Sequence, residues 1–237
     1  MYNIVRLNKY KKPVFPFLMQ ETEKMVNSLF YGYINGDILL SESVFVFLQT
    51  IYTNQNGHSL LNPGCLFAGR VSEVADISEF NLSPSKASEF FDAYYHKGSL
   101  RNRFSSDYFI YPGHLYSSTP ELFEDVVLGR YYIDNWIMGS VLVKNGVLVD
   151  ATKTSGFFSV THSLIVHGIH MGADTYWKRS IRTMISLKDF YYNKEIVRAD
   201  YPWTSLVYSN YTTGNTCRFW VISCRRMEKV IFSLRKE

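Results

Sequence analysis

Strand-like and helix-like segments alternate along the first two-thirds of this chain. Apolar residues at mixed three- and four-residue spacing predict a helix over residues 16–30. A Ser-Glu-Ser start followed by similar spacing predicts another helix over residues 41–52. This alternation is typical of an α/β domain, with a mixed, mostly parallel sheet and flanking helices. We therefore expect a single α/β domain over residues 1–237.

The other expected elements follow the same alternation, with short apolar runs as strands and longer periodic runs as helices. The further predicted helices cover residues 83–97 and 133–144. The predicted strands cover residues 31–35, 65–71, 107–111 and 147–151, with a late strand within residues 215–223. In open α/β sheets ligands bind beyond the carboxyl ends of the strands, so these ends are where a site is expected.

Composition excludes several classes of protein. A chain of 237 residues with 46% hydrophobic residues can bury a real core, so disorder is excluded. Its 25 basic and 21 acidic residues are scattered, which argues against nucleic acid as a partner. No apolar window reaches the roughly 18 residues of a membrane span, so the chain as given is expected to be soluble. Three cysteines without paired spacing make a zinc site improbable.

Acidic residues stand at two positions where chemistry is expected. The apolar strand over residues 31–35 ends in Asn35, Gly36 and Asp37. A second carboxylate, Asp134, stands at the start of an apolar helix-like segment. Asp150 occupies another strand end. Two carboxylates at such positions, Asp37 and Asp134, suggest a site.

Five blocks of sequence occur in an order that resembles a known family. The blocks are YINGDILL, LFAGRV, SDYFIYP, LGRYYIDNW and VLVDATK, with Thr-His-Ser after the last. In this order the chain resembles a eukaryotic glycosyltransferase-like family of the A fold, within the nucleotide-diphospho-sugar transferases. The similarity spans roughly Phe15 to Thr161. It implies a nucleotide-sugar donor and an unknown acceptor as partners.

The resemblance also implies a metal site. Residues 35–37 stand where the A fold carries its metal-binding Asp-x-Asp, so Asp37 is the expected ligand of Mn²⁺ or Mg²⁺. A diphosphate leaving group needs its charge neutralised by such a cation or by cationic side chains. His162, after a predicted strand, is the other expected ligand, with a structural histidine as the alternative. Asn35 replaces the first aspartate, and an amide would hold a hard cation less strongly.

Asp134 is the expected catalytic residue. A carboxylate at a helix amino end, close to the donor, suits the general base of an inverting transfer, although aspartate is also a common helix cap. Arg130, Asn135 and Trp136 are expected to bind substrate beside it. Arg130 would contact phosphate or acceptor. Trp136 would stack on a sugar ring, although a tryptophan on such a helix is more often part of the core.

Two more strand-end residues are candidates for substrate binding. Arg70 follows a predicted strand and would face the donor phosphates, the alternative being a surface salt bridge. Asp107 begins a predicted strand and would bind substrate, the alternative being a turn cap.

The chain departs from the family at its beginning. In the A fold a nucleotide-binding strand-helix-strand unit precedes the metal-binding strand, whereas this chain reaches that strand by Tyr33. We therefore expect this first unit to be missing, which would uncover an edge of the sheet. Sugar transfer is then expected of a full-length form, for which Golgi, other secretory and cytoplasmic locations all stay open. The alternative is a non-catalytic carbohydrate-binding or scaffolding relative of the same fold.

Overall fold

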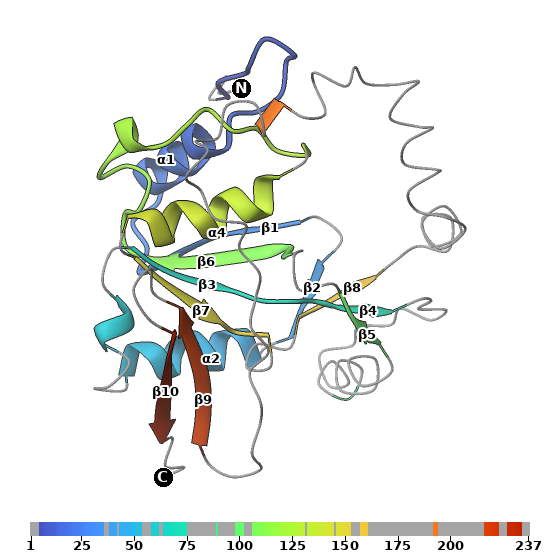
Figure 1. Cartoon of the computed structure of the whole chain (residues 1–237), viewed down its shortest axis with the longest axis vertical. Helices are drawn as coiled ribbons and strands as arrows, with labels where there is room; N and C mark the ends of the chain where they lie inside the picture. The colour runs from blue at the N-terminus through green and yellow to red at the C-terminus, as the bar shows by residue number, and fades with distance from the viewer. Residues whose placement is uncertain are drawn as a thin grey trace.

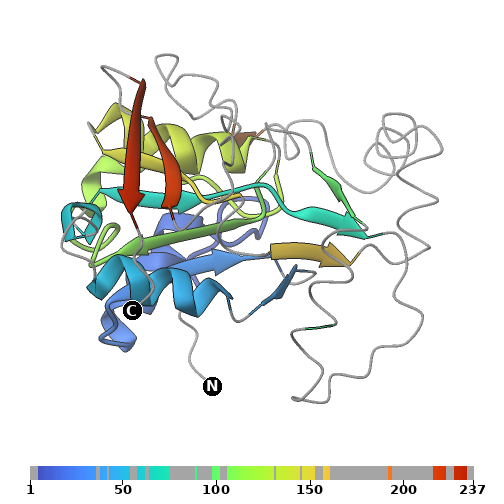
Figure 2. The same ribbon diagram turned by 90° about the horizontal axis from the view of Figure 1, so that it is seen from below.

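The computed structural model contains two β-sheets, the larger of which carries helices on both faces (Figure 1). The smaller sheet lies at one end of the larger one in both views (Figures 1 and 2). The structure describes residues 5–35, 38–41, 43–53, 58–61, 64–74, 89, 98–101, 106–130, 132–144, 146–152, 157–160, 192–193, 216–222 and 227–233.

The larger sheet has the strand order β1-β6-β3-β7-β9-β10, and the smaller has the order β2-β8-β4-β5. The strands of the larger sheet are β1 Phe30–Ile34, β6 Tyr108–Pro112, β3 Cys65–Ala68, β7 Val147–Asp150, β9 Thr216–Ile222 and β10 Met227–Ser233. Those of the smaller sheet are β2 Ile38–Leu40, β8 Phe157–Val160, β4 Ser72–Val74 and β5 Ser99–Leu100. The α-helices are α1 Phe15–Met25, α2 Ser43–Thr53 and α4 Ile133–Val143, and the 3-10 helices are η1 His58–Leu61 and η3 Pro120–Leu122.

Both sheets are mixed, but parallel pairing does not predominate among the strands that the structure describes. Only β3 with β7 and β4 with β8 pair in parallel. The expectation of a mostly parallel sheet was therefore wrong. The reason is that β6 runs between β1 and β3 against the direction of both, while β9 and β10 form an antiparallel ribbon beside β7. Hydrophobic pattern predicts where a strand lies and does not give its direction.

Most of the predicted elements are present. Helices α2 and α4 and strands β6, β7 and β9 lie close to their predicted ranges. Helix α1 ends at Met25, well before residue 30, because Val26 already has an extended backbone. The helix expected over residues 83–97 lies almost wholly outside the described residues. Across the part of the chain that the structure describes, no helix is both long and apolar enough to cross a membrane.

Alternating side chains of the central strands divide the core into two layers. Leu66 and Phe109 belong to the layer that includes α1 and α4, whereas Phe67 and Ile110 belong to the layer that includes α2. This alternation follows from the two-residue period of a β-strand. Both faces of β3 and β6 are thus covered, which explains why their sequences read as continuous apolar runs.

A buried carboxylate ties α1 to the segment that follows β6. Glu23 is 3% exposed, and its Oε1 accepts hydrogen bonds from the Tyr111 hydroxyl at 2.8 Å and the Tyr116 amide at 3.0 Å. Its Oε2 accepts from the Ser117 amide at 2.7 Å. These donors offset the cost of burying a charge. Burial, with Tyr116 and Glu23 nearby, raises the pKa of Tyr111, so this phenol stays a donor.

We expect Glu23→Gln to lower the free energy of unfolding by about 2 kcal/mol, because an amide NH₂ would face groups that are themselves donors. Chemical denaturation monitored by circular dichroism would measure the loss. Glu21→Gln is the matched control on the same helix, since Glu21 pairs with the exposed Lys24 at 2.7 Å. Its cost should stay below about 0.5 kcal/mol. Equal losses in the two variants would contradict an anchoring role for Glu23.

Lys144, which directly follows the last residue of α4, is poorly solvated. Its Nζ lies 2.9 Å from the centroid of the Phe123 ring and has no hydrogen-bond partner among the described residues. Burial lowers the pKa of Lys144 to about 8, and the nearby Glu124 and Glu121 offset part of this effect. The charged form of Lys144 therefore opposes folding.

This lowered pKa predicts a pH-dependent effect of Lys144→Met. The ordinary lysine pKa is 10.5, so the unfavourable contribution is fully present below about pH 8 and is relieved as the pH rises toward 10.5. At pH 7 the variant should gain about 1 kcal/mol in free energy of unfolding, a value reduced for the partial exposure of this side chain. Urea titrations at pH 7 and pH 10 would measure the gain, which should shrink at the higher pH. A gain independent of pH would contradict the shifted pKa.

Candidate functional site

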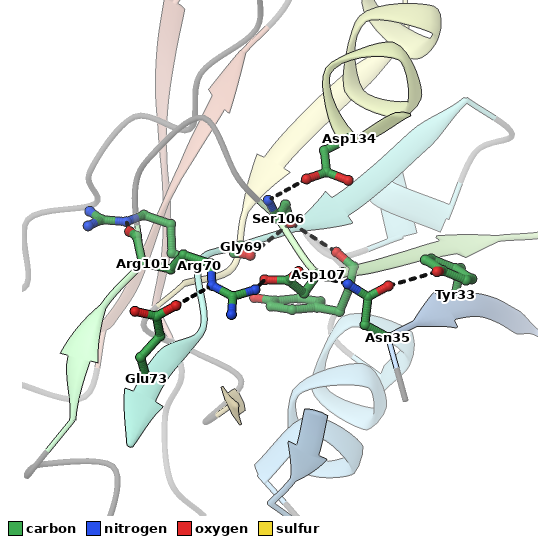
Figure 3. A network of polar contacts seen from close by, with 10 residues as sticks. Tyr33, Asn35, Gly69, Arg70, Glu73, Arg101, Ser106, Asp107 and Asp134 are labelled. Carbon is green, nitrogen blue, oxygen red and sulfur yellow. Dashed lines mark hydrogen bonds and ion pairs between the residues drawn. The ribbon is translucent and has the colours of Figure 1, made fainter. Parts of the chain in front are cut away.

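Several strand ends and the start of a helix meet at one end of the larger sheet. β1 ends at Ile34, beside the start of the antiparallel β6. β3 and β7 run in parallel and end at Ala68 and Asp150. The first turn of α4 reaches the same place through Asp134, as Figure 3 shows. The carboxyl ends of β1, β3 and β7 thus lie at the same edge of the larger sheet.

Asn35 and Asp107 form the centre of a polar network. The Asn35 amide N–H donates to the main-chain oxygen of Asp107 at 2.9 Å, and its Nδ2 donates to Asp107 Oδ1 at 2.7 Å. The carbonyl oxygen of the Asn35 side chain accepts from the Tyr33 hydroxyl at 2.7 Å (Figure 3). Both ends of this side-chain amide are thus held, with nitrogen toward Asp107 and oxygen toward Tyr33.

Arg101 lies between two carboxylates and connects the two sheets. It follows β5, and its Nε donates to Glu73 Oε1 of β4 at 2.7 Å. Its Nη1 donates to Asp107 Oδ2 at the start of β6 (Figure 3). Burial acts to lower the pKa of Arg101, but Asp107 and Glu73 together outweigh it and raise this pKa. The side chain of Asp107 is only 7% exposed, so the guanidinium compensates a largely buried negative charge.

The guanidinium of Arg70 binds main-chain oxygens. Its Nε donates to the carbonyl of Arg101 at 2.5 Å and its Nη2 to that of Leu100 at 3.4 Å. The Arg70 amide N–H donates to Thr152 Oγ1 at 3.0 Å. These contacts hold the end of β3 against both β5 and the segment after β7. Arg70 therefore stabilises the packing of these segments against one another.

The ends of β3 and β7 approach each other closely because residue 69 is glycine. A Cβ at Gly69 would lie 2.0 Å from the Tyr108 hydroxyl and 2.7 Å from the Thr152 amide nitrogen. Asp150, 1% exposed, accepts from the Thr152 amide at 2.9 Å and from its hydroxyl at 2.5 Å through Oδ1. Asp150 thus stabilises the turn at residues 150–152, which directly follows β7.

Asp134 contacts the network from α4. The N-cap of α4 is Tyr132, which has a left-handed backbone with φ 82° and no side-chain capping bond, so Asp134 is not the cap residue. Its half-buried carboxylate lies in the first turn, where the helix dipole favours negative charge. Asp134 Oδ2 accepts from the Ser106 amide at 3.4 Å, a long hydrogen bond. Ser106 in turn donates from its hydroxyl to the carbonyl of Gly69 at 2.8 Å.

Three predicted neighbours of Asp134 are buried instead of open to substrate. Trp136 is 0% exposed and its Nε1 donates to Glu124 at 2.9 Å, so the prediction that it stacks on a sugar is wrong. Two residues along an α-helix span about 200°, which turns Trp136 into the core when Asp134 faces the network. Arg130 and Asn135 are 7% and 8% exposed, and neither belongs to the network of Figure 3.

The two expected metal ligands, Asp37 and His162, lie outside the described residues. Within the described ranges, no three histidine, cysteine, aspartate or glutamate side chains are grouped so as to hold a metal ion. The side-chain oxygen of Asn35 already accepts from Tyr33, and both carboxylate oxygens of Asp107 accept from Asn35 and Arg101. These side chains do not fit a divalent cation by themselves.

Sequence reasoning missed four members of the network, namely Tyr33, Glu73, Arg101 and Ser106. Tyr33 could have been found, because residues two apart in a strand share a face and Tyr33 stands two before Asn35. Arg101 carries no such signal. It follows a strand of only two residues, and its partners Glu73 and Asp107 stand 28 and 6 positions away.

A double-mutant cycle would test the ion pair between Arg101 and Asp107. We expect Arg101→Met to lower the free energy of unfolding by about 2 kcal/mol, because Asp107 would keep a buried charge without its cation. Combining it with Asp107→Asn should cost less than the sum of the single losses, with a coupling of about 1 kcal/mol. Lys24→Met with Glu21→Gln is the exposed control pair, with coupling below about 0.5 kcal/mol. Additive losses at Arg101 and Asp107 would contradict the pairing.

No relative guides the assignment of this site. The chain matches no protein-family model, no curated protein and no solved structure.

Proposed function

We propose that the chain is a glycosyltransferase-like domain of the A type, which transfers a sugar from a nucleotide-diphosphate donor to an acceptor hydroxyl. One observation carries the proposal. Asn35, Asp107 and Asp134, which are far apart in the sequence, belong to one polar network at the sheet end where β1, β3 and β7 finish. Ligands of α/β folds gather at such ends.

In this proposal the two aspartates of the network have different tasks. Both oxygens of Asp107 accept hydrogen bonds, so Asp107 holds Asn35 and Arg101 in place. Asp134 is half-buried, and its contact with the Ser106 amide is weak at 3.4 Å. As a carboxylate in the first turn of α4, Asp134 is the proposed general base, which would accept the proton of the acceptor hydroxyl.

The proposed step transfers one proton and exchanges one bond. The acceptor hydroxyl gives its proton to the Asp134 carboxylate while its oxygen forms a bond to the anomeric carbon of the donor sugar. The bond from that carbon to the diphosphate breaks, and its electron pair leaves with the phosphate oxygen. A carboxylate positioned within hydrogen-bond reach of the acceptor typically contributes about 10²–10⁴-fold to such a step.

The charge at this end of the sheet bears on donor binding. Among the described side chains at this end, Arg101 pairs with Glu73 and Asp107 and Arg70 binds main-chain oxygens, so two guanidinium groups stand against the four carboxylates of Glu73, Asp107, Asp134 and Asp150. An anionic diphosphate would be repelled there unless a cation accompanied it. A divalent cation supplies that charge when bound, and Asp37 with His162 are the proposed ligands.

A thermal-shift assay with UDP or GDP would test donor binding. We expect the melting temperature to rise with nucleotide and Mn²⁺ together and to stay unchanged with nucleotide alone, because ligand binding stabilises the folded state and the site carries excess negative charge. A magnesium arm would separate a general need for divalent charge from a preference for manganese. No shift with either nucleotide in the presence of either cation would contradict the proposal.

Asp134→Asn would test the catalytic assignment. We expect it to abolish nucleotide release from a panel of UDP- and GDP-sugars while leaving the nucleotide-dependent thermal shift unchanged. Asp125→Asn is the matched control, since Asp125 is 43% exposed and pairs with Arg6 away from the network. Loss of folding in Asp134→Asn, with Asp125→Asn intact, would instead make Asp134 a structural residue.

A non-catalytic carbohydrate-binding protein is the alternative, and one observation favours it. The side-chain amide of Asn35 and the carboxylate of Asp107 are already held by neighbouring side chains, as in a rigid binding surface. This alternative predicts that free glycans raise the melting temperature without nucleotide or metal.

A further inference from the structure

β1 is an edge strand with an open outer side. The Asn35 amide donates to Asp107 and the Gly113 amide donates to the carbonyl of Leu29, so odd-numbered residues of β1 direct their main-chain groups toward β6. The main-chain groups of Gly32 and Ile34 therefore point to the other side. Within the described parts of the chain no strand pairs with that side, and β1 ends the sheet in Figure 1. Gly32 itself is exposed.

This edge lacks the features that normally protect an edge strand. The sequence of β1, FYGYI, contains no charged residue and no proline. The segment just before it exposes three large apolar side chains, Met25 at 64%, Val26 at 56% and Leu29 at 59%. An uncharged edge beside exposed apolar residues is a surface suited to receiving another strand.

We propose that this edge pairs with β1 of a second copy of the chain, antiparallel, about a two-fold axis at Gly32. A two-fold axis brings the same strand of each copy together, and FYGYI then presents only aromatic, apolar and glycine residues to its partner. In this register Gly32 lies opposite the partner's Gly32, and Tyr31 opposite the partner's Tyr33. Phe30 then lies opposite the partner's Ile34. Aromatic and apolar cross-strand pairs of this kind stabilise antiparallel sheets, and no charge meets a like charge.

The same register connects the interface to the polar network. Leu29, which is 59% exposed in a single copy, comes to lie opposite the partner's Asn35. Each copy thus places an apolar side chain beside the amide that is hydrogen-bonded to Asp107 in the other. Pairing would exclude water from the surroundings of each polar network. It would also join the larger sheets of the two copies into one continuous sheet.

A second apolar surface lies on α2 and competes for the role of interface. Phe45, Val46 and Tyr52 of this helix are 67%, 61% and 46% exposed, and the helix carries no charged residue. Nothing in the structure shows what covers α2, and it lacks the self-complementary backbone edge of β1. The experiment therefore includes this surface as a control.

Light scattering after size-exclusion chromatography, combined with residue-resolved hydrogen exchange, tests the proposal on the unmodified chain. We expect a dimer whose fraction rises with concentration. Exchange at the Gly32 and Ile34 amides should slow at least about tenfold as the dimer forms. A monomer at every concentration overturns the proposal. A dimer in which both amides still exchange freely overturns it too, because the interface is then elsewhere.

Gly32→Lys tests the register, because it places two ammonium groups opposite each other at the axis. The Cβ it adds would lie 3.1 Å from the Phe109 carbonyl and 3.3 Å from Ile110 Cγ1, so Gly32→Ala controls for this crowding. Val46→Lys adds the same charge on α2. We expect the dimer to be lost in Gly32→Lys and kept in both controls. Loss in Val46→Lys alone would assign the interface to α2, and a folded, dimeric Gly32→Lys would also overturn the proposal.

Discussion

The ion pair between Arg101 and Asp107 is the interaction on which the arrangement of this molecule depends. Asp107 begins β6, the strand that lies between β1 and β3, and its carboxylate also receives the amide of Asn35. Arg101 brings β5 and Glu73 of β4 to the same point, so one guanidinium connects the smaller sheet to the larger one. Because Asp107 is largely buried, removing either side chain would leave the other as an unpaired charge, which would strongly destabilise the fold. The same residues therefore form the candidate site and the junction between the two sheets.

Strand β6 has a buried carboxylate at each of its ends. Asp107 is held by Asn35 and Arg101 at its start, and Glu23 is held by Tyr111 near its finish. A slip of β6 by one residue would turn its side chains to the opposite faces and separate both carboxylates from their donors. The two polar clusters thus fix the register of β6, while the apolar layers around it supply most of the driving force for folding.

Sequence patterns predicted much of this fold because they report local preferences. The Ser-Glu-Ser start and the spacing of α2 and the periodic apolar run of α4 predicted both helices well, and the short apolar run at residues 107–111 corresponds to β6. Asn35, Asp107 and Asp134 were predicted as candidate site residues because they stand at strand ends and a helix start, and the structure brings them into one polar network. The direction of β6 and the position of Arg101 could not be predicted, because both depend on contacts between distant segments. Trp136 is buried because it lies on the face of α4 that meets the sheet. The sequence RYYIDNW alone does not show which face of the helix this is.

The central position of β6 also has a consequence for synthesis on the ribosome. Asn35 and Asp107 stand 72 positions apart, and Glu23 stands 94 positions before Ser117. β1 and α1 therefore emerge from the ribosome long before β6, which pairs with β1 and whose Tyr111 donates to Glu23 of α1. At about 5–20 residues per second the nascent chain carries an uncharged, unpaired β1 for several seconds. During that interval the main-chain groups of β1 are open to pairing with other chains.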